Sequence, residues 1–420
     1  MNVGVNAEPN WFEPYSLIIS YILNDTDSLI NSARQIHEYL MLHTTISEID
    51  YRNINIHFSE YLQNSYGYIC IYLSNCVYYL YWIISDCYFL IMHLRFDEKE
   101  TIMSEKIIDL YMDIPTGEDL YLTRLSMYCL GDGPHTRMGY RRLFRGGEAK
   151  AIGLDLDELD RIVAEQGEDA FTKVVQEHSK AYAWTEESFM KHIEELHVEW
   201  GFTGSHDRDN EKTAALVARY PDKLKGACYI NPAKGMDAVR ELEYYVKERN
   251  LSALYISPIR IGMPANDKRC YPLYAKAAEL DIPVFIYANM NLISTLPMEI
   301  GHPRNIDEVA SFFPELRIMI TVGGWPWMNE AVGVVIRHDN VYLDTEIIPP
   351  KNLTEPGNGY EFLIYHIRNS FPDKFCFASN WAMNGLQLEL AIQQIKDLPF
   401  DDGVIENILY NNAKRFFNET

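Results

Sequence analysis

The first quarter of this 420-residue chain has very little glycine and proline. Residues 1–102 hold 2 of the 23 glycines and 2 of the 19 prolines, but 12 of the 29 tyrosines. Glycine and proline make the turns of compact folds, so this scarcity indicates that the segment is not built like the rest. We therefore divide the chain into an N-terminal extension over 1–102, mostly helical or poorly structured, and a folded domain over 103–420.

Basic residues are also scarce. The chain has 37 Lys and Arg against 60 Asp and Glu, a net charge of −23. The acidic excess occurs in both parts, with 4 basic against 12 acidic residues in 1–102 and 33 against 48 in the remainder. Nucleic-acid binding requires a basic face, so we expect a small-molecule ligand and no nucleic acid.

The seven cysteines form no recognisable framework. Their number is odd, no CxxC is present, and the N-terminus has no secretory signal pattern. Such usage is typical of free thiols in a reducing compartment. We therefore expect a cytoplasmic protein.

One long run lacks charge altogether, over residues 65–85. Its length reaches the roughly 20 residues of a membrane span. However, Ser74 and Asn75 interrupt it, Asp86 follows, and no Lys/Arg cluster would set an orientation. A buried or partner-facing helix is the alternative, and we expect no membrane association.

A third interpretation concerns the whole of 1–102. Met103 would be the natural start and 1–102 would be upstream sequence, which the mass of the native N-terminus would test.

From Met103 onward, short apolar runs alternate with longer amphipathic stretches, which is typical of βα units and a parallel sheet. The predicted strands cover 106–109, 200–205, 225–230, 252–257, 283–288, 317–321, 340–344 and 374–379. The predicted helices include 186–199, 237–249, 271–280, 305–313 and 402–417. Eight strands in this length fit a (β/α)8 barrel of the α/β class. A doubly wound open sheet is the alternative, but no GxGxxG follows the first strand.

The longest insertion follows the first strand. It includes 131–147 (GDGPHTRMGYRRLFRGG), which is dense in glycine and arginine. Because barrel function lies on the loops after the strands, Arg141 and its neighbours could clamp a carboxylate or phosphate. The alternative is a solvated loop or a dimer contact.

The stretch 302–344 (HPRNIDEVASFFPELRIMITVGGWPWMNEAVGVVIRHDNVYLD) resembles the amidohydrolase-related family that includes aminocarboxymuconate-semialdehyde decarboxylase and resorcylate decarboxylases. The stretches 271–286 and 377–381 (FASNW) support the resemblance, which covers essentially all of 103–420. It implies a distorted TIM barrel, frequently dimeric, so we expect a homodimer or a pair with a paralogue. It also implies one divalent metal, commonly zinc, at the carboxyl ends of the strands.

The metal ligands of that family are replaced in this chain. Its first strand should read Asp-x-His-x-His, its fifth and sixth should each supply a histidine, and its eighth should supply an aspartate. The five replaced positions hold Tyr111, Asp113, Tyr287, Thr321 and Asn380. Zinc requires nitrogen or sulfur donors or several carboxylates, so we predict that the family zinc is absent and that no other cofactor is used.

The replacements are polar, and they define a candidate catalytic cluster. Asp113 is the acid among them, suited to general acid–base work if buried. Tyr111 and Tyr287 could donate hydrogen bonds to an oxyanion, Asn380 brings an amide, and Tyr255 stands where the family often has Lys. The alternative is a polar core plug without turnover.

Further residues are candidates for substrate contact. Glu346 follows the seventh strand and could pair with Asp113 as a second carboxylate, or could face water. His302 and Thr321 lie near the predicted barrel mouth, where a structural hydrogen bond is the alternative for His302. Trp381 could wall the pocket. Asp109 and Asp344 are expected to be structural.

Two functions follow from these residues. The first is a metal-independent hydrolase or decarboxylase (lyase) that acts on a small carboxylated or aromatic substrate. The second is a pseudoenzyme, a barrel kept as a binding or partner subunit.

Overall fold

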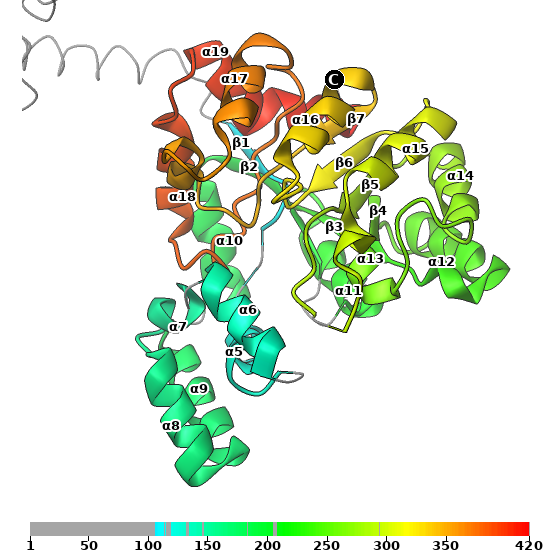
Figure 1. Ribbon diagram of the computed structural model, residues 1–420. Coiled ribbons are helices and arrows are strands. Elements are labelled where there is room, and N and C mark those ends of the chain that lie inside the picture. Colours follow the sequence, from blue (N-terminus) through cyan, green and yellow to red (C-terminus); the bar gives the residue numbers. More distant parts are fainter. Residues whose placement is uncertain are drawn as a thin grey trace, which may run out of the picture. The chain divides into compact units, whose positions relative to one another are not determined.

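The computed structural model describes residues 106–419, except for 113, 115–118, 132–133, 145–146, 183, 205–207 and 294 (Figure 1). The extension over 1–102, the candidate helix over 65–85 and the candidate catalytic residue Asp113 lie outside the described residues. No helix in the described part of the chain is long and apolar enough to cross a membrane.

The described residues contain seven parallel strands, paired in chain order from the first to the seventh. They are β1 (Ile107–Asp109), β2 (Val198–Thr203), β3 (Leu224–Tyr229), β4 (Ala253–Ile256), β5 (Val284–Tyr287), β6 (Ile318–Thr321) and β7 (Val341–Leu343). Each strand is followed by one or more helices, and in Figure 1 those after β2 to β7 lie around the sheet while α5 to α9, after β1, extend away from it. The predicted TIM-barrel architecture is confirmed.

The eighth strand, predicted over 374–379, is not a regular strand. Its contact with β7 is one parallel bridge, between Leu343 and Phe375. On its other side, Leu110 N donates to Phe377 O at 3.0 Å and Asn380 N donates to Tyr111 O at 3.0 Å. The segment therefore closes the barrel with a few hydrogen bonds, which makes the barrel distorted.

Alternate residues of the strands enter two separate apolar clusters. Leu254 and Ile256 of β4 pack outward with the helices, whereas Ala253 and Tyr255 pack inside the barrel. The inner cluster is aromatic, with the rings of Phe202 and Phe285 stacked at 4.4 Å between centroids. Parallel strands buried on both faces are apolar at nearly every position, so an inward polar side chain at a strand end is a functional candidate.

The outer layer is formed by α10 (Glu186–Glu195), α11 (Asn210–Arg219), α12 (Met236–Lys247), α14 (Tyr271–Glu279), α15 (Arg304–Phe312), α16 (Met328–Arg337), α17 (Glu361–Asn369) and α18 (Leu388–Lys396). The helix expected over 186–199 is shorter than predicted because β2 already begins at Val198. The helix expected over 402–417 is divided into α19 (Asp402–Glu406), the π-helix η4 (Asn407–Asn411) and α20 (Asn412–Phe416).

The insertion after β1 is helical and has its own core. It contains α5 (Asp119–Cys129), α6 (Pro134–Phe144), α7 (Gly147–Ala151), α8 (Leu156–Gln166) and α9 (Glu168–Tyr182). The prediction of a loop over 131–147 is wrong, because the helix α6 occupies most of this stretch. Leu125, Leu159 and Phe171 are fully buried in the cluster that these helices share.

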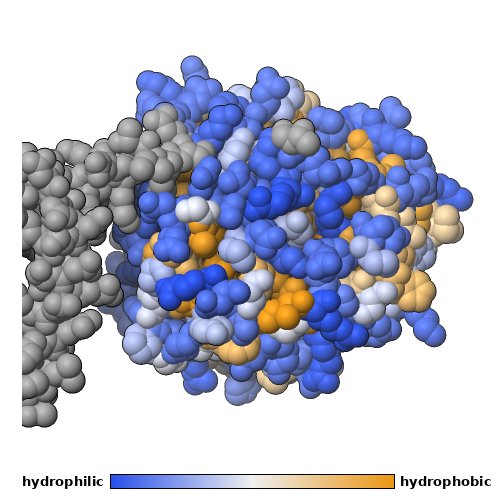
Figure 2. Space-filling view, turned by 90° about the horizontal axis from the view of Figure 1, so that it is seen from above, coloured by the Kyte–Doolittle hydropathy of each residue, from blue (hydrophilic) through white to orange (hydrophobic). Residues whose placement is uncertain are grey.

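The insertion meets the barrel at two glycines. A Cβ on Gly385, which has φ +63°, would lie 2.5 Å from the Gly147 carbonyl oxygen. At position 385 only a residue without a side chain allows such an approach. The molecular face in Figure 2 is mainly hydrophilic, with separate hydrophobic patches.

Candidate active site

A cavity of about 500 Å³ lies at the carboxyl ends of the strands. Five of the predicted site residues line it, namely Tyr111, Tyr255, Tyr287, Glu346 and Asn380. They come from four strand ends and from the segment after β7, so residues far apart in the sequence meet here. In barrels this is the end that carries function.

Tyrosine rings form one wall of the cavity. Tyr229 at the end of β3 and Tyr255 on β4 have ring centroids 4.9 Å apart. Tyr255 is also stacked with Phe285 at 6.4 Å, which joins the wall to the aromatic interior of the barrel. This arrangement offers flat apolar faces with hydroxyl groups at their edges, which suits an aromatic ligand with polar substituents.

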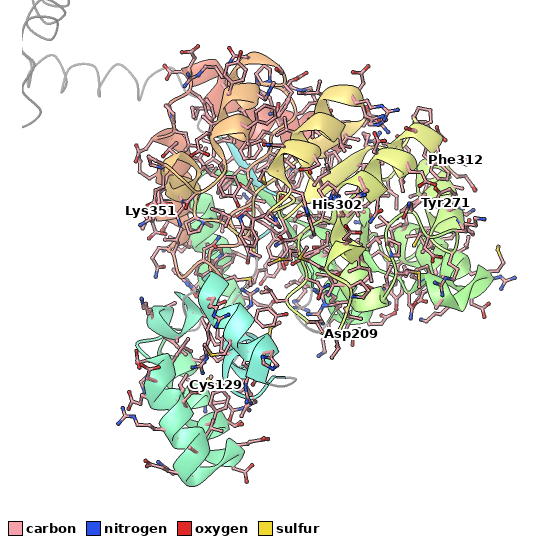
Figure 3. All side chains as sticks on the ribbon, viewed as in Figure 1. Cys129, Asp209, Tyr271, His302, Phe312 and Lys351 are labelled. Atoms are coloured by element: carbon pink, nitrogen blue, oxygen red, sulfur yellow. The ribbon has the colours of Figure 1, made fainter. Side chains whose placement is uncertain are left out.

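Arg208 brings a positive charge to the tyrosine wall. Its guanidinium lies 5.3 Å from the centre of the Tyr229 ring, a cation–π distance. Arg208 adopts φ 59°, and the next residue, Asp209, caps α11 by accepting from the backbone N–H groups of Glu211 and Lys212 at 2.9 and 3.3 Å (Figure 3). The start of the helix thus fixes the backbone beside the arginine.

Tyr229 is fixed from behind by Asn210. The Asn210 Nδ2 donates to Tyr229 O at 2.9 Å, and Tyr229 N donates to Asn210 Oδ1 at 2.9 Å. Gly204 leaves room for the ring, because a Cβ there would lie 2.7 Å from the Tyr229 hydroxyl. Neither residue was predicted to belong to the site.

Glu346 is a buried carboxylate in the cavity wall. Its backbone N–H donates to Asp344 Oδ1 at 3.3 Å, and its carbonyl accepts from Asn384 Nδ2 at 2.8 Å. Burial raises the pKa of Tyr255 well above its usual value, and the negative charge of Glu346 raises it further, while Arg208 opposes the shift. The Tyr255 phenol therefore stays protonated and available as a donor.

Tyr287 has the same surroundings. Burial raises the pKa of its phenol, with further contributions from Tyr140 and Glu346, and Arg208 again acts in the opposite direction. Arg208 and Glu346 therefore lie within electrostatic reach of the same two phenols. The cavity thus combines a cation, a carboxylate and two neutral donors.

Two buried aspartates lie beneath the cavity lining. Asp109 accepts from Ser379 N at 2.8 Å, from Ser379 Oγ at 2.5 Å and from Tyr111 N at 3.0 Å. Asp344 Oδ1 accepts from Thr321 Oγ1 at 3.1 Å and from Val322 N at 3.0 Å. These hydrogen bonds hold the backbone of the strand ends, which agrees with the structural role expected for both aspartates.

Burial raises the pKa of Asp344 to about 7, and the charge of Asp109 adds to the shift against the effect of the three donors. Asp344 Oδ2 has no hydrogen-bond partner among the described residues. Thr321 is bound to Asp344 and does not line the cavity.

Asn380 occupies the strand-end position of the eighth segment with φ 38°, a conformation that asparagine tolerates better than most residues. Its Nδ2 lies 3.5 Å from the Met383 sulfur. Its buried Oδ1 has no hydrogen-bond partner in the part of the chain that the structure describes. The amide therefore retains an acceptor for a ligand.

Besides Thr321, the predicted contact residues His302, Trp381 and Arg141 do not line this cavity. His302 Nδ1 accepts from Arg304 N at 3.1 Å, its ring lies 4.4 Å from that of Trp327, and burial lowers its pKa (Figure 3). The Trp381 ring is stacked on Phe189 at 5.8 Å. These contacts agree with the alternative interpretation of His302 and with a packing role for Trp381.

Arg141 is held inside the insertion. Its two terminal nitrogens donate to the carboxylate of Asp160 at 2.5 and 2.6 Å, and its Nε donates to Tyr128 O at 3.0 Å. The neighbouring Tyr140 and the buried Arg124 of α5 line the cavity in its place. Arg260 of the short helix α13 (Pro258–Ile261) adds a third arginine to the lining.

The described side chains at the strand ends do not fit a zinc ion of the family type. The strand ends offer two phenols, a hydroxyl and an amide at Tyr111, Tyr287, Thr321 and Asn380. Zinc in proteins is held by imidazole, thiolate and carboxylate. Among the described residues, no group of three or more His, Cys, Asp or Glu is placed to hold a metal.

Residues 178–418 match the model of a protein family described as amidohydrolase. Solved structures similar to the chain include two with TM-scores of 0.50 or above. An uncharacterized TIM-barrel protein from Bordetella bronchiseptica is 22% identical with a TM-score of 0.54, covering 74% of this chain and 98% of its own. A 5-carboxyvanillate decarboxylase from Sphingomonas paucimobilis is 14% identical with a TM-score of 0.50, covering 76% and 100%. At these identities the likeness concerns the fold alone. No curated protein sequence matches the chain.

Proposed function

Because the chain belongs to the amidohydrolase family, we propose that its barrel is an enzyme that acts on a small aromatic carboxylate without the metal that the family commonly uses. The reaction is a hydrolysis or a decarboxylation. The observation that carries the proposal is the composition of one cavity, where Arg208 and the tyrosine wall stand beside the Glu346 carboxylate.

The arginines supply recognition of an anion. A guanidinium binds a carboxylate through paired N–H donors, and Arg208, Arg124 and Arg260 all line the cavity. The rings of Tyr229 and Tyr255 supply a surface for an aromatic group. A small aromatic carboxylate therefore matches both the charge and the shape of the lining.

The carboxylates supply acid–base chemistry. Glu346 lines the cavity, and Asp113 follows Met112, which lines it as well. In a decarboxylation the bond between the ring and its carboxylate breaks, the electron pair stays on the ring carbon, and a carboxylic acid donates the proton as CO2 leaves. In a hydrolysis a carboxylate takes a proton from the attacking water, while the phenols of Tyr255 and Tyr287 donate to the oxyanion.

The test has a binding step and a turnover step. Calorimetry with benzoate should give a Kd that Arg208→Met weakens by about tenfold or more, as expected for the loss of a charge-assisted hydrogen bond. Arg240→Met is the matched control, because Arg240 is exposed and paired with Asp237 on α12. Absence of benzoate binding in the wild type would contradict the proposal.

Turnover is then measured on a panel of aromatic carboxylates, esters and lactones, by CO2 release and by product formation. Glu346→Gln and Asp113→Asn should each abolish it while circular dichroism stays unchanged. Binding without turnover across the panel would instead favour a pseudoenzyme, a function that the Asn380 amide at the family's carboxylate position also supports.

We further propose that the protein is cytoplasmic. We also propose that it forms a homodimer or a pair with a paralogue, and light scattering of the purified protein tests this oligomeric state.

A further inference from the structure

A second cavity, of about 560 Å³, lies beside the first. Its apolar walls come from the segments after β5, β6 and β7, namely Met290, Leu292, Trp325, Ile348 and Pro349, and polar side chains, among them Arg142, Glu355 and Tyr360, complete the lining. None of the chemistry proposed above uses it. Its size is in the range of small-molecule sites, roughly 300–1,000 Å³.

The two cavities share wall residues. Ile347 and Met383 line both of them. Helix α6 also lines both, with Tyr140 at the first cavity and Gly139 at the second. At Ile347 and Met383, therefore, the partition is only one side chain thick.

The side chain of Met383 is suited to act as a movable partition between the two cavities. Methionine is unbranched and has three rotatable bonds, so it adapts to different neighbours at little energetic cost. Its sulfur lies 3.5 Å from the Asn380 amide nitrogen, which places it beside the candidate reaction site. A rotation of this side chain would change the wall of both cavities at once.

The amides of Asn384 and Asn358 in the second cavity are bonded within the protein, whereas the buried Tyr360 hydroxyl has no hydrogen-bond partner among the described residues. Asn384 Nδ2 donates to the carbonyls of Glu346 and Ser379 at 2.8 and 3.0 Å. Asn358 Nδ2 donates to Asn352 O at 2.9 Å. The apolar side chains of the lining, Met290, Leu292, Trp325, Ile348 and Pro349, therefore match an apolar occupant.

From this geometry we infer that the second cavity is a subsite for an apolar, ring-sized tail of the substrate, which passes between Ile347 and Met383. This inference rests on the proposed function, because the first cavity must hold the carboxylated head. The substrate class is then a two-part molecule, an aromatic carboxylate extended by a second apolar group.

The test compares a short ligand, benzoate, with a long ligand, biphenyl-4-carboxylate, by calorimetry on the full chain. Burial of the second ring should make the long ligand bind about tenfold to a hundredfold more tightly. Gly139→Leu fills the second cavity from α6, where a Cβ would lie 3.6 Å from the Leu292 side chain. It should remove the preference for the long ligand and leave benzoate binding within about twofold, as expected for an independent site.

Leu292→Trp fills the same cavity from the loop after β5 and serves if the first variant does not fold. Leu390→Trp is the control, because Leu390 is 45% exposed on α18. If both filling variants bind benzoate and keep the wild-type preference, or if the wild type shows no preference, the subsite is overturned while the proposed function stands. If benzoate itself does not bind, the proposed function fails and the subsite fails with it.

Discussion

The phenols of Tyr255 and Tyr287 show how burial prepares a side chain for binding an anion. Burial raises the pKa of both groups, chiefly because an ionised phenolate loses its hydration. Both therefore stay protonated at neutral pH and can donate to a carboxylate or an oxyanion. Arg208 beside them supplies the charge, so the phenols add direction without adding negative charge.

Asp344→Asn should change how stability depends on pH. Burial raises the pKa of Asp344 to about 7 in the folded protein, so between about pH 4, near the pKa of an unfolded aspartate, and pH 7 the folded state binds more protons than the unfolded state. Stability from this group is therefore present at low pH and is lost as the pH rises, by up to about 1.4 kcal/mol per pH unit. The asparagine removes this slope.

Urea unfolding at several pH values between 4 and 7 measures the effect of Asp344→Asn. The amide fits the site, because Oδ1 keeps its donors and the NH2 group replaces the oxygen that has no partner among the described residues. Asp222→Asn is the control at an exposed carboxylate. Equal slopes in Asp344→Asn and the wild type would show that Asp344 does not hold the extra proton.

Asn210→Ala should destabilise the protein and weaken the anion site. The substitution leaves the backbone N–H and carbonyl of Tyr229 without their side-chain partner, which costs about 1–3 kcal/mol for each buried group. Because Arg208 lies over the Tyr229 ring, benzoate affinity should fall as well. Asn266→Ala, at a half-buried asparagine whose side chain makes a solvent-exposed hydrogen bond to Glu308, should change neither the unfolding midpoint nor the Kd.

At the residue scale, sequence patterns found part of the cavity lining. Tyr111, Tyr255, Tyr287 and Asn380 could be predicted because they replace expected residues at strand ends. Tyr229 could not, because within 225–230 it reads as one more member of an apolar strand. Arg124 was also missed, since a helical pattern does not say which face of the insertion packs on the barrel.

At the scale of elements, the eighth strand shows a different limit. The run over 374–379 is apolar enough to predict a strand, but regular pairing depends on both neighbours. The contact with the β1 side passes through Leu110 and Tyr111, beyond the end of that short strand. The side chain of Asp109 provides part of the closure by accepting from Ser379, and no periodicity reveals such a bond.

Gly385→Ala should loosen the insertion from the barrel. The new Cβ would lie 2.5 Å from the Gly147 carbonyl oxygen, a backbone atom that cannot simply rotate away, and the residue has φ +63°. We expect a loss of stability of about 2–4 kcal/mol, from left-handed strain of about 1 kcal/mol and the displaced contact. Helices α5 to α9 should also become more sensitive to limited proteolysis.

Gly357→Ala is the matched control for Gly385→Ala. Gly357 has φ +85°, but a Cβ there would meet no atom within 4 Å. It should therefore lose only the roughly 1 kcal/mol of left-handed strain and leave the proteolysis pattern of the insertion unchanged. If the two alanine variants behave alike, the contact between Gly147 and Gly385 does not hold the insertion in place.

At the scale of the whole molecule, the cavity differs in charge from its surroundings. The chain carries a net charge of −23, while Arg124, Arg208 and Arg260 line one cavity beside the single described carboxylate Glu346. An acidic surface repels anions. At an ionic strength of about 0.1 M, salt largely screens this repulsion at separations beyond about 10 Å. Anion recognition must therefore come from contacts inside the cavity and not from steering by the overall field.

The absence of zinc is a prediction about the whole barrel, because its ligands would have to come from five positions at four strand ends. A single lost histidine would weaken a metal site, but replacement at five positions removes nearly every nitrogen donor at once. We therefore expect purified protein to contain zinc well below one equivalent by plasma mass spectrometry. Dialysis against a chelator should leave both the benzoate Kd and the thermal unfolding midpoint unchanged, because no metal contributes to either. Zinc added back after dialysis should also not raise the midpoint. A stoichiometric zinc that survives dialysis, and that Asp113→Asn or Glu346→Gln releases, would contradict the prediction, since these carboxylates would then be ligands and not acid–base groups.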